Sequence, residues 1–452
     1  MEWATNRRPK VRLSRLRTER SYTSLMIAPL LAFLLIGGPA PVQADRLAGA
    51  SREEREGWVC VKISGTPSEI GYQHGALLAP EIADAKAVIE EEMRGSTGKP
   101  WSWFRDTAKE LYWDQVTPEL KQEMKGIAEG ASEKGTKVDV WDILALNAHI
   151  ELEGYYLPWL KGQASQKEAC SAFVATGSWT KDSKPVMGHS FWWGWTSGQR
   201  FKAVLTVKPD KGHAYVMDAL PGFVHSGTDW AINDAGMVLC ETTISGFAGY
   251  DPEGIPEFVR MRRAVQFGDS IDSMAEIFRA GNNGGYANAW LMADAKTGEI
   301  GKLELGLKHT PLAKTKDGTF YGANFPEHPS ILRDEIPDGW NTNLAQNGCE
   351  ARRARWKEIM AQEKGKIDTE SAKRYLADTK NVVTGENKAG DGTLCGRSSW
   401  GGAIQAKVTN ATMIGQMRYE GRMGAPDGVN LKLATPSQKF LKDMPARPWV
   451  GL

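Results

Sequence analysis

Cys170 stands at the head of a short apolar run, and this placement constrains the fold more than any other feature of the sequence. The run covers residues 170–175, and the next apolar run ends at His189. The spacer at 180–185 is polar and rich in turn-forming residues, which is typical of a hairpin that joins two strands. The sequence therefore predicts two paired strands with Cys170 at the start of the first.

The segment ahead of this cysteine is predicted to be an exposed loop. Residues 155–169 contain Pro158 and Gly162, followed by a polar stretch. Exposed loops are where chains are cut. We therefore expect a precursor that is cleaved between Ala169 and Cys170.

The predicted secondary structure changes at Cys170. Residues 45–169 are predicted to be helical after one strand at 58–63, because apolar residues such as Leu78, Ile82 and Ile89 follow helical spacing. Residues 170–452 mix strands with helices. The expected strands are 201–207, 213–219, 237–243, 286–294, 299–305 and 319–324. The expected helices are 255–280 (one helix or two), 350–362 and 369–378. A closing hairpin is expected to join strands 400–408 and 411–418. This order favours an α+β architecture of stacked sheets with helices outside.

Residues 1–44 have the pattern of a secretory signal peptide. Seven basic residues precede an apolar run from Leu25 to Ile36, and a Val-x-Ala sequence follows at 42–44. A membrane anchor is the alternative, but a spanning helix needs roughly 20 apolar residues and this run is shorter. We expect cleavage after Ala44 and a product that is periplasmic or secreted.

The remaining composition excludes several classes of protein. Residues 45–452 carry 49 basic and 53 acidic side chains, so the net charge is about −4 and predicts no nucleic-acid surface. Five cysteines leave at least one thiol unpaired, and Cys349 with Cys395 is a candidate disulfide. The chain has no CxxC or HExxH pattern, so we expect no metal site and no cofactor.

Cleavage before Cys170 would give this residue its own base. A thiol is a good nucleophile only as a thiolate, so a nearby group must take its proton. A new α-amino group, with a pKa of about 8, is suited to that task near neutral pH. His189 could assist this amine or orient it. The alternative is that Cys170 is a buried cysteine of the core.

The sequence around Cys170 resembles the nucleophile region of the phospholipase B-like family. Cys-Ser-Ala-Phe at 170–173 is followed by Gly-His-Ser-Phe-Trp at 188–192. More broadly, the chain resembles the penicillin acyltransferase-like enzymes of the N-terminal nucleophile (Ntn) hydrolase superfamily. The other similar segments, in the same order as in the family, are 71–75, 220–229, 240–243, 282–290, and Arg397 with 401–409.

The resemblance implies a four-layer αββα sandwich of the Ntn hydrolase type, autoproteolysis at Ala169–Cys170 and a thioester on Cys170. It also implies that Asn288 offers its side-chain amide to the oxyanion. The further site residues are Arg397 in the active site, and Asp229 and Thr242 on the new amine or the nucleophile. Apart from the resemblance, the aromatic residues Trp192 and Trp193 could line an acyl-chain pocket, and packing in the core is the alternative. The chain would then comprise a signal peptide (1–44), a helical segment (45–169) and a catalytic region (170–452).

These features predict a secreted, self-processing hydrolase for amide or ester bonds of lipid-like or N-acyl substrates. Gln405, Ala287 and Ala289 depart from the family pattern and put the substrate in doubt. An amidase or acyltransferase acting on N-acyl small molecules is one alternative, and a non-catalytic secreted binding protein is another. The expected partners are a small acyl or lipid molecule and, transiently, membrane lipid. The sequence leaves the oligomeric state open.

Overall fold

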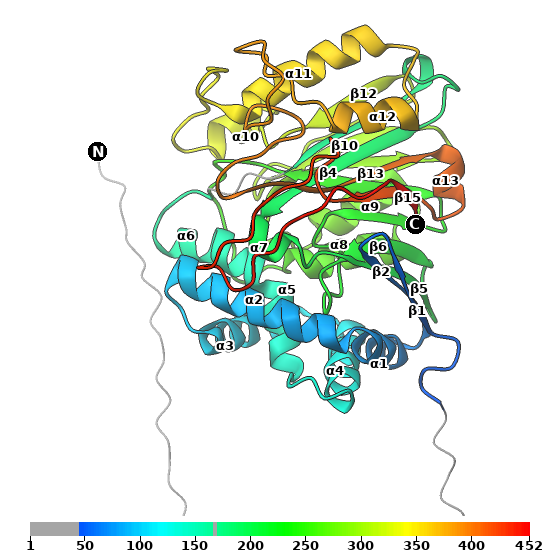
Figure 1. Ribbon diagram of the computed structural model, residues 1–452, viewed down its shortest axis with the longest axis vertical. Helices are drawn as coiled ribbons and strands as arrows, with labels where there is room; N and C mark the ends of the chain where they lie inside the picture. The colour runs from blue at the N-terminus through cyan, green and yellow to red at the C-terminus, as the bar shows by residue number, and fades with distance from the viewer. Residues whose placement is uncertain (1–44, 166–169) are drawn as a thin grey trace, which may run out of the picture. The chain divides into compact units, whose positions relative to one another are not determined.

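The computed structural model describes residues 45–165 and 170–452, and residues 46–452 form one compact unit (Figure 1). The expected signal peptide and Ala169 lie outside the described residues. Residues 45–169 and 170–452 do not form separate domains, because strand β2 of the first segment pairs in parallel with strand β5 of the second. Within the described residues, no helix is long and apolar enough to cross a membrane.

The first sheet is mixed and draws on both regions of the chain. Its strands pair in the order β1-β2-β5-β6-β7-β8-β9-β10-β11, and every pair except β2 with β5 is antiparallel. The strands are β1 (Ser51–Arg55), β2 (Trp58–Gly65), β5 (Ala203–Pro209), β6 (Tyr215–Ala219), β7 (Trp230–Asn233), β8 (Met237–Thr243), β9 (Asn288–Asp294), β10 (Ile300–Leu305) and β11 (Leu312–Thr315).

The second sheet carries the cysteine hairpin and is antiparallel throughout. Its order is β12-β3-β4-β13-β14-β15. The strands are β3 (Ser171–Thr176), β4 (Val186–Gly194), β12 (Gly318–Gly322), β13 (Gly401–Asn410), β14 (Glu420–Met423) and β15 (Val450–Gly451). The predicted hairpin is confirmed, because β3 pairs with β4 across the polar spacer.

The helices form two groups that lie far apart in sequence. The first covers the nine-stranded sheet, and α11 with α12 covers the other sheet (Figure 1). The first group is α1 (Pro67–Leu77), α2 (Ala79–Thr97), α3 (Trp101–Tyr112), α4 (Pro118–Glu133), α5 (Val140–Glu151), α8 (Glu257–Phe267) and α9 (Ile271–Arg279). The others are α6 (Leu157–Leu160), α7 (Trp195–Gly198), α10 (Pro329–Asp334), α11 (Gly348–Glu363), α12 (Thr369–Leu376) and α13 (Ala411–Gly415).

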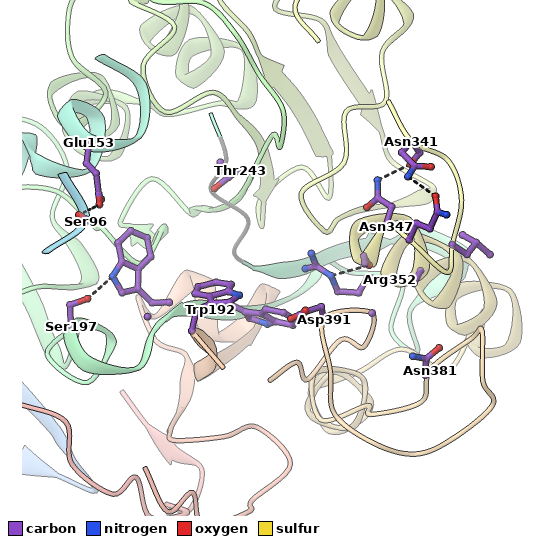
Figure 2. A pocket seen from close by; sticks show the side chains of 18 of the residues that line it. Ser96, Glu153, Trp192, Ser197, Thr243, Asn341, Asn347, Arg352, Asn381 and Asp391 are labelled. Carbon is purple, nitrogen blue, oxygen red and sulfur yellow. Dashed lines mark hydrogen bonds between the residues drawn. The ribbon is translucent and has the colours of Figure 1, made fainter. Parts of the chain in front are cut away.

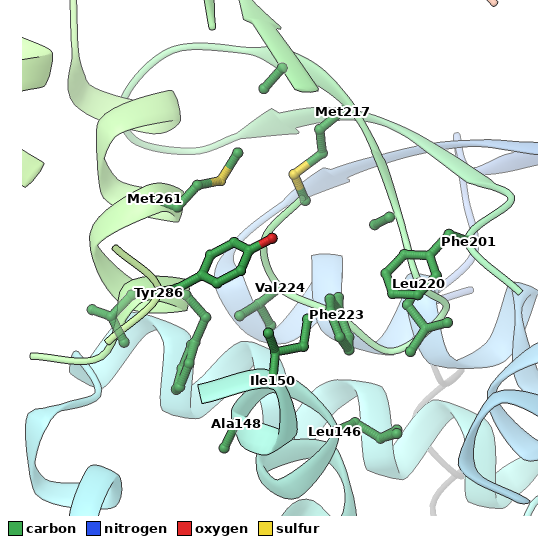
Figure 3. Packing of buried hydrophobic residues seen from close by; sticks show 14 of the residues in the cluster. Leu146, Ala148, Ile150, Phe201, Met217, Leu220, Phe223, Val224, Met261 and Tyr286 are labelled. Atoms are coloured by element: carbon green, nitrogen blue, oxygen red, sulfur yellow. The ribbon is translucent and has the colours of Figure 1, made fainter. Parts of the chain in front are cut away.

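Side chains that point alternately to the two faces of each sheet form the contacts between the layers. In β8, Met237 and Leu239 pack with the first helices, whereas Val238 and Cys240 pack between the sheets, since successive side chains of a strand point to opposite faces. In β3, Phe173 faces α11 and α12. The order is therefore helices, sheet, sheet, helices. Figure 3 shows part of the helix–sheet core, where Leu146 and Ile150 of α5 lie near Phe223 and Val224.

Several sequence-based expectations are wrong in detail. Residues 411–415 form helix α13 rather than the second strand of a hairpin. Residues 155–160 are not loop, because a π-helical turn at Leu152–Tyr156 and then α6 extend α5. All five cysteines are free thiols, so Cys349 and Cys395 form no disulfide.

Candidate active site

A cavity of about 1060 Å³ lies where the first helices, strand β4 and helix α11 converge (Figure 2). Trp192 and Trp193 at the end of β4 line it, and so do Thr243 and Arg352. Both tryptophans that the sequence assigned to an acyl pocket therefore face one large cavity. Long connections complete its wall with Asn341, Leu344, Gln346, Asn347, Asn381, Val383 and Asp391.

Cys170 lies directly behind this wall. It precedes β3 and has no exposed surface. Its carbonyl oxygen accepts a hydrogen bond of 2.7 Å from Arg352 Nη1, and its sulfur accepts one from the backbone N–H of Trp192. Arg352 also stacks its guanidinium on the Trp192 ring at 4.6 Å. Two cavity-lining residues thus hold the two ends of Cys170.

Two carboxyl groups approach the sulfur from the nine-stranded sheet. One ligating atom from each of Cys170, Asp229 and Glu241 lies within 4.8 Å of the other two, and these residues are buried. The hydroxyl of Tyr286 donates to Asp229 Oδ2 at 3.4 Å. The three groups are close enough to ligate a metal ion, although the sequence predicts no metal site.

Burial determines the protonation of these groups. It raises the pKa of Asp229 to about 6, with the Glu241 hydrogen bond opposing the shift. Burial, and then the charge of Asp229, raises the pKa of Glu241 well above its ordinary value. Since the two carboxyls are in contact, Glu241 keeps a proton and donates it to an ionised Asp229.

The Cys170 thiol is itself protonated in the uncut chain. Burial raises its pKa well above the ordinary value, and the neighbouring Glu241–Asp229 carboxyl pair, which carries one negative charge when Asp229 is ionised, adds to the effect. The Trp192 N–H and the ammonium of Lys407 oppose the shift. The thiol therefore needs a base before it can react.

Asn288 lies at the cavity side of the nine-stranded sheet. It is the first residue of β9, it pairs directly with cavity-lining Thr243, and directly paired residues share a face. Its side chain is fully buried, and neither its Nδ2 nor its Oδ1 has a hydrogen-bond partner among the described residues. A buried amide without hydrogen-bond partners lowers the free energy of unfolding. A protein is expected to keep such an amide where it binds a ligand.

Thr242 points to the opposite face of the same strand. Its Oγ1 would lie 2.2 Å from a Cβ on Gly322, so it packs between the two sheets. Alternation along β8 therefore turns Glu241 and Thr243 towards the cavity side and Thr242 away from it.

His189 also lies between the sheets. It pairs with Ala172 on one side and Lys407 on the other, and its ring stacks on Trp230 with the centroids 6.4 Å apart. Burial, and then the charge of Lys407, lowers the pKa of its imidazole well below the ordinary value, so the ring is neutral. Neither ring nitrogen reaches hydrogen-bond geometry with a described residue.

Arg352, and not the predicted Arg397, contacts the candidate nucleophile. Arg397 forms an ion pair with Asp427, and it does not line the cavity within the described residues. Arg352 contacts Cys170 and also donates to Asn324 Oδ1 at 3.0 Å. Sequence reasoning missed Arg352, Glu241 and Tyr286. Glu241 and Tyr286 carried a signal, because they belong to the family-like segments at 240–243 and 282–290, whereas Arg352 carried none.

Residues 66–325 match the family pattern of phospholipase B. The chain belongs to the phospholipase B family. A protein of Archaeoglobus fulgidus is 25% identical over 60% of this chain and 48% of its own length. The phospholipase B-like 1 protein of Caenorhabditis elegans is 24% identical over 44% of this chain and 37% of its own length.

Two further proteins are similar. The 40 kDa form of acyl-coenzyme A:6-aminopenicillanic-acid-acyltransferase from Emericella nidulans is 25% identical over 51% of this chain and 59% of its own length. A mutant conjugated bile acid hydrolase of Clostridium perfringens, a solved structure, is 12% identical, with a TM-score of 0.33 over 56% of this chain and 89% of that one. The matches thus span about half the length of the curated relatives.

Proposed function

We propose that this chain is a periplasmic or secreted acyl hydrolase of the Ntn type, which cuts itself before Cys170 and then uses this residue as its nucleophile. One observation carries the proposal. The Cys170 sulfur lies beside a carboxyl pair, while Trp192 and Arg352, which hold the residue, line a large cavity.

Self-cleavage would begin with attack of the Cys170 sulfur on the carbonyl carbon of Ala169. The thiol proton passes to the leaving amide nitrogen, the peptide bond breaks, and a thioester forms. Water then hydrolyses the thioester and leaves a free α-amino group on Cys170. The backbone conformation supports this step. Cys170 has a φ of 126°, a value that residues other than glycine rarely adopt, so its backbone is strained. Cleavage would release that strain.

Turnover would follow the same course on an external substrate. The α-amino group takes the thiol proton, the sulfur attacks the acyl carbon, and the amine or alcohol leaves with the proton. Asp229 could accept a hydrogen bond from the α-amino group, and Asn288 could donate its free amide to the oxyanion, a contribution of roughly 3 kcal/mol when preorganised. Water would complete the hydrolysis. An amine that replaced water would make the enzyme an acyltransferase, as the name of the Emericella relative describes.

Intact-mass analysis of the purified protein tests the proposal. We expect two fragments, with the larger beginning at Cys170, and one uncut chain for Cys170→Ala. The matched control is Cys60→Ala, which removes a half-buried thiol on β2 and should leave cleavage unchanged.

The processed protein should then gain one acyl group from an activated ester, and a peptide map should locate this group on residue 170. An uncut wild-type chain that forms no adduct with iodoacetamide would contradict the proposal and favour a non-catalytic binding protein.

A further inference from the structure

We propose that Cys170, Asp229 and Glu241 bind a zinc ion, and that this ion prevents Cys170 from acting as a nucleophile. The metal site stands on the geometry of these residues, whereas its inhibitory effect rests on the proposed function. Zinc would thus control when the chain cuts itself and when the processed protein acts on a substrate.

The three residues direct one ligand atom each to a single place. The thiol sulfur and one oxygen of each carboxyl group lie within 4.8 Å of one another, and all three side chains are buried. Zinc binds thiolate sulfur at about 2.3 Å and carboxylate oxygen at about 2.1 Å, so its ligands lie roughly 3.5 Å apart. Rotation of the two carboxyl groups would bring the oxygens to that spacing. Short sequence patterns such as CxxC could not reveal this site, because its ligands come from three distant segments.

Asn288 offers a further ligand atom on the same face of the sheet. In the pairing of β8 with β9 it lies opposite Thr243 and diagonally opposite Glu241, so these side chains project from one face. The Asn288 amide is fully buried, and neither of its polar atoms has a hydrogen-bond partner among the described residues. This amide indicates, independently of the carboxyl pair, that the face binds a polar ligand. Its Oδ1 could complete the four ligands that zinc prefers.

Binding of the ion leaves the buried charge unchanged. Raised pKa values keep a proton on Glu241 and on the Cys170 thiol, and Asp229 is ionised at neutral pH, so the cluster carries one negative charge. A zinc ion would replace the two protons, which pass to solvent. Three anionic ligands around one divalent cation again carry one negative charge. Zinc therefore adds no unpaired charge to the core, where such a charge is costly.

The cavity gives the ion a route to these groups. Tyr286, whose hydroxyl donates to Asp229 Oδ2 at 3.4 Å, lines the cavity. Trp192 lines it as well and donates its backbone N–H to the Cys170 sulfur. Movement of side chains at the cavity wall would therefore be enough for the ion to enter or leave.

Zinc on the sulfur would stop both reactions of Cys170. The thiolate would donate its electron pair to the metal, so it would attack neither the carbonyl carbon of Ala169 nor an external acyl group. A chelator that removes the ion would restore the free thiol. Magnesium prefers oxygen ligands in a regular octahedron and does not suit a thiolate site. Inhibition should therefore be specific to thiol-binding metals.

Cobalt(II) tests the metal site without any turnover, because it accepts the same ligands as zinc and absorbs light. Metal-free protein with reduced thiols is titrated with cobalt chloride under nitrogen. We expect about one equivalent to bind and to give the near-ultraviolet charge-transfer band of a thiolate–cobalt bond. An equal amount of zinc should abolish this band, and Cys170→Ala should not show it. A wild-type protein without the band would overturn the inference.

Variants of the other ligands locate the ion. Asp229→Asn and Glu241→Gln should each weaken cobalt binding at least about tenfold, since even groups that only orient a metal ligand contribute that much. The matched control is Cys240→Ala, which removes the buried thiol next to Glu241 in the chain. Because Cys240 packs between the sheets, its loss should leave the band and the affinity unchanged. Wild-type affinity in both carboxyl variants, or loss of the band in the control alone, would overturn the assignment.

Refolding separates this inference from the proposed function. The full chain is recovered uncut and unfolded in urea and then refolded with a chelator, with zinc or with magnesium, and intact mass gives the cut fraction. We expect cleavage with the chelator and with magnesium, loss of cleavage with zinc, and recovery when the chelator is added later. Equal cleavage with zinc and with the chelator would overturn the inference and leave the proposed function standing. If the chelator-treated chain stays uncut while the thiolate–cobalt band persists, the proposed function fails and the metal site stands.

Discussion

Asp229 and Glu241 bring two carboxyl groups together in a place that solvent does not reach. Because burial raises the pKa of Asp229 to about 6, this group ionises only as the pH rises through that value. If ionised Asp229 holds the Cys170 amine, kcat/KM should fall about tenfold for each pH unit below 6. Asp229→Asn should remove this dependence and most of the activity.

Glu241 offers the matched comparison. Because it keeps its proton, Glu241→Gln replaces one neutral hydrogen-bond donor by another and should keep kcat/KM within about threefold. Glu241→Ala should lose more, since it removes the donor to Asp229. A lower kcat/KM for Glu241→Gln than for Glu241→Ala would show that Glu241 acts as an ionised carboxylate.

The same proton affects stability. The folded pKa of Asp229 lies above its unfolded value near 4, so the folded state binds this proton more tightly. Stability should therefore fall as the pH rises from about 4 to 6, and Asp229→Asn should flatten this slope in urea titrations.

Single residues of the site were predicted unevenly from the sequence. Cys170 and Trp192 could be found because they belong to one local segment. Arg352 could not, since it stands in a charged helix where nothing distinguishes a buried arginine from a solvated one. Its contact with Cys170 spans 182 positions of the chain and appears only when α11 packs on the second sheet.

At the scale of elements, α1 and α4 approach more closely than side chains allow. A Cβ on Gly75 would lie 2.1 Å from the carbonyl oxygen of Ile127, and one on Gly130 would lie 2.2 Å from that of Tyr72. Gly75→Ala must push the helices apart, and we expect a loss of about 3 kcal/mol in the free energy of unfolding. Urea denaturation measures this loss.

Gly95→Ala is the control for helix propensity. Gly95 lies in α2, and a Cβ there would meet nothing within 4 Å. Alanine should therefore stabilise the protein by roughly 0.5–1 kcal/mol. Equal effects of the two substitutions would mean that the α1–α4 contact adjusts freely.

This contact also explains the Gly-Tyr-Gln-His-Gly segment at 71–75. The glycines of this segment pack against α4. His74 Nε2 accepts a hydrogen bond of 2.9 Å from the backbone N–H of Gly222, and burial lowers the pKa of its ring to about 3.

The periodicity of apolar residues predicted the helices well, because each helix buries one apolar face. It failed at 411–415, where the Asn410 side chain caps a helix that apolar composition alone does not distinguish from a strand.

At the scale of the whole molecule, the sequence indicated two sheets with helices outside but not how the strands are ordered. Strand β2 precedes Cys170 by more than a hundred residues, yet it pairs with β5, which follows Cys170. Such pairings depend on contacts distant in sequence, and no local pattern records them.

One ion pair joins the two sheets through the core. Lys407 Nζ of β13 lies 2.9 Å from Asp218 Oδ2 of β6, and both side chains are fully buried. Lys407 also donates to the carbonyl oxygen of Thr228 at 3.2 Å, next to Asp229. The pair thus fixes one sheet against the other and holds the turn that carries the carboxyl group of the site.

Lys407→Met should cost about 3–5 kcal/mol in the free energy of unfolding at neutral pH, because it leaves Asp218 charged and unpaired inside the protein. The deficit should shrink at lower pH, since burial already raises the pKa of Asp218 and this carboxyl can take a proton. Adding Asp218→Asn to Lys407→Met should recover most of the loss, because no buried charge then remains. Urea titrations of wild type, both single variants and the double variant give the coupling between the sites. A Lys407→Met protein within about 1 kcal/mol of wild type at neutral pH would mean that apolar packing alone holds the sheets together.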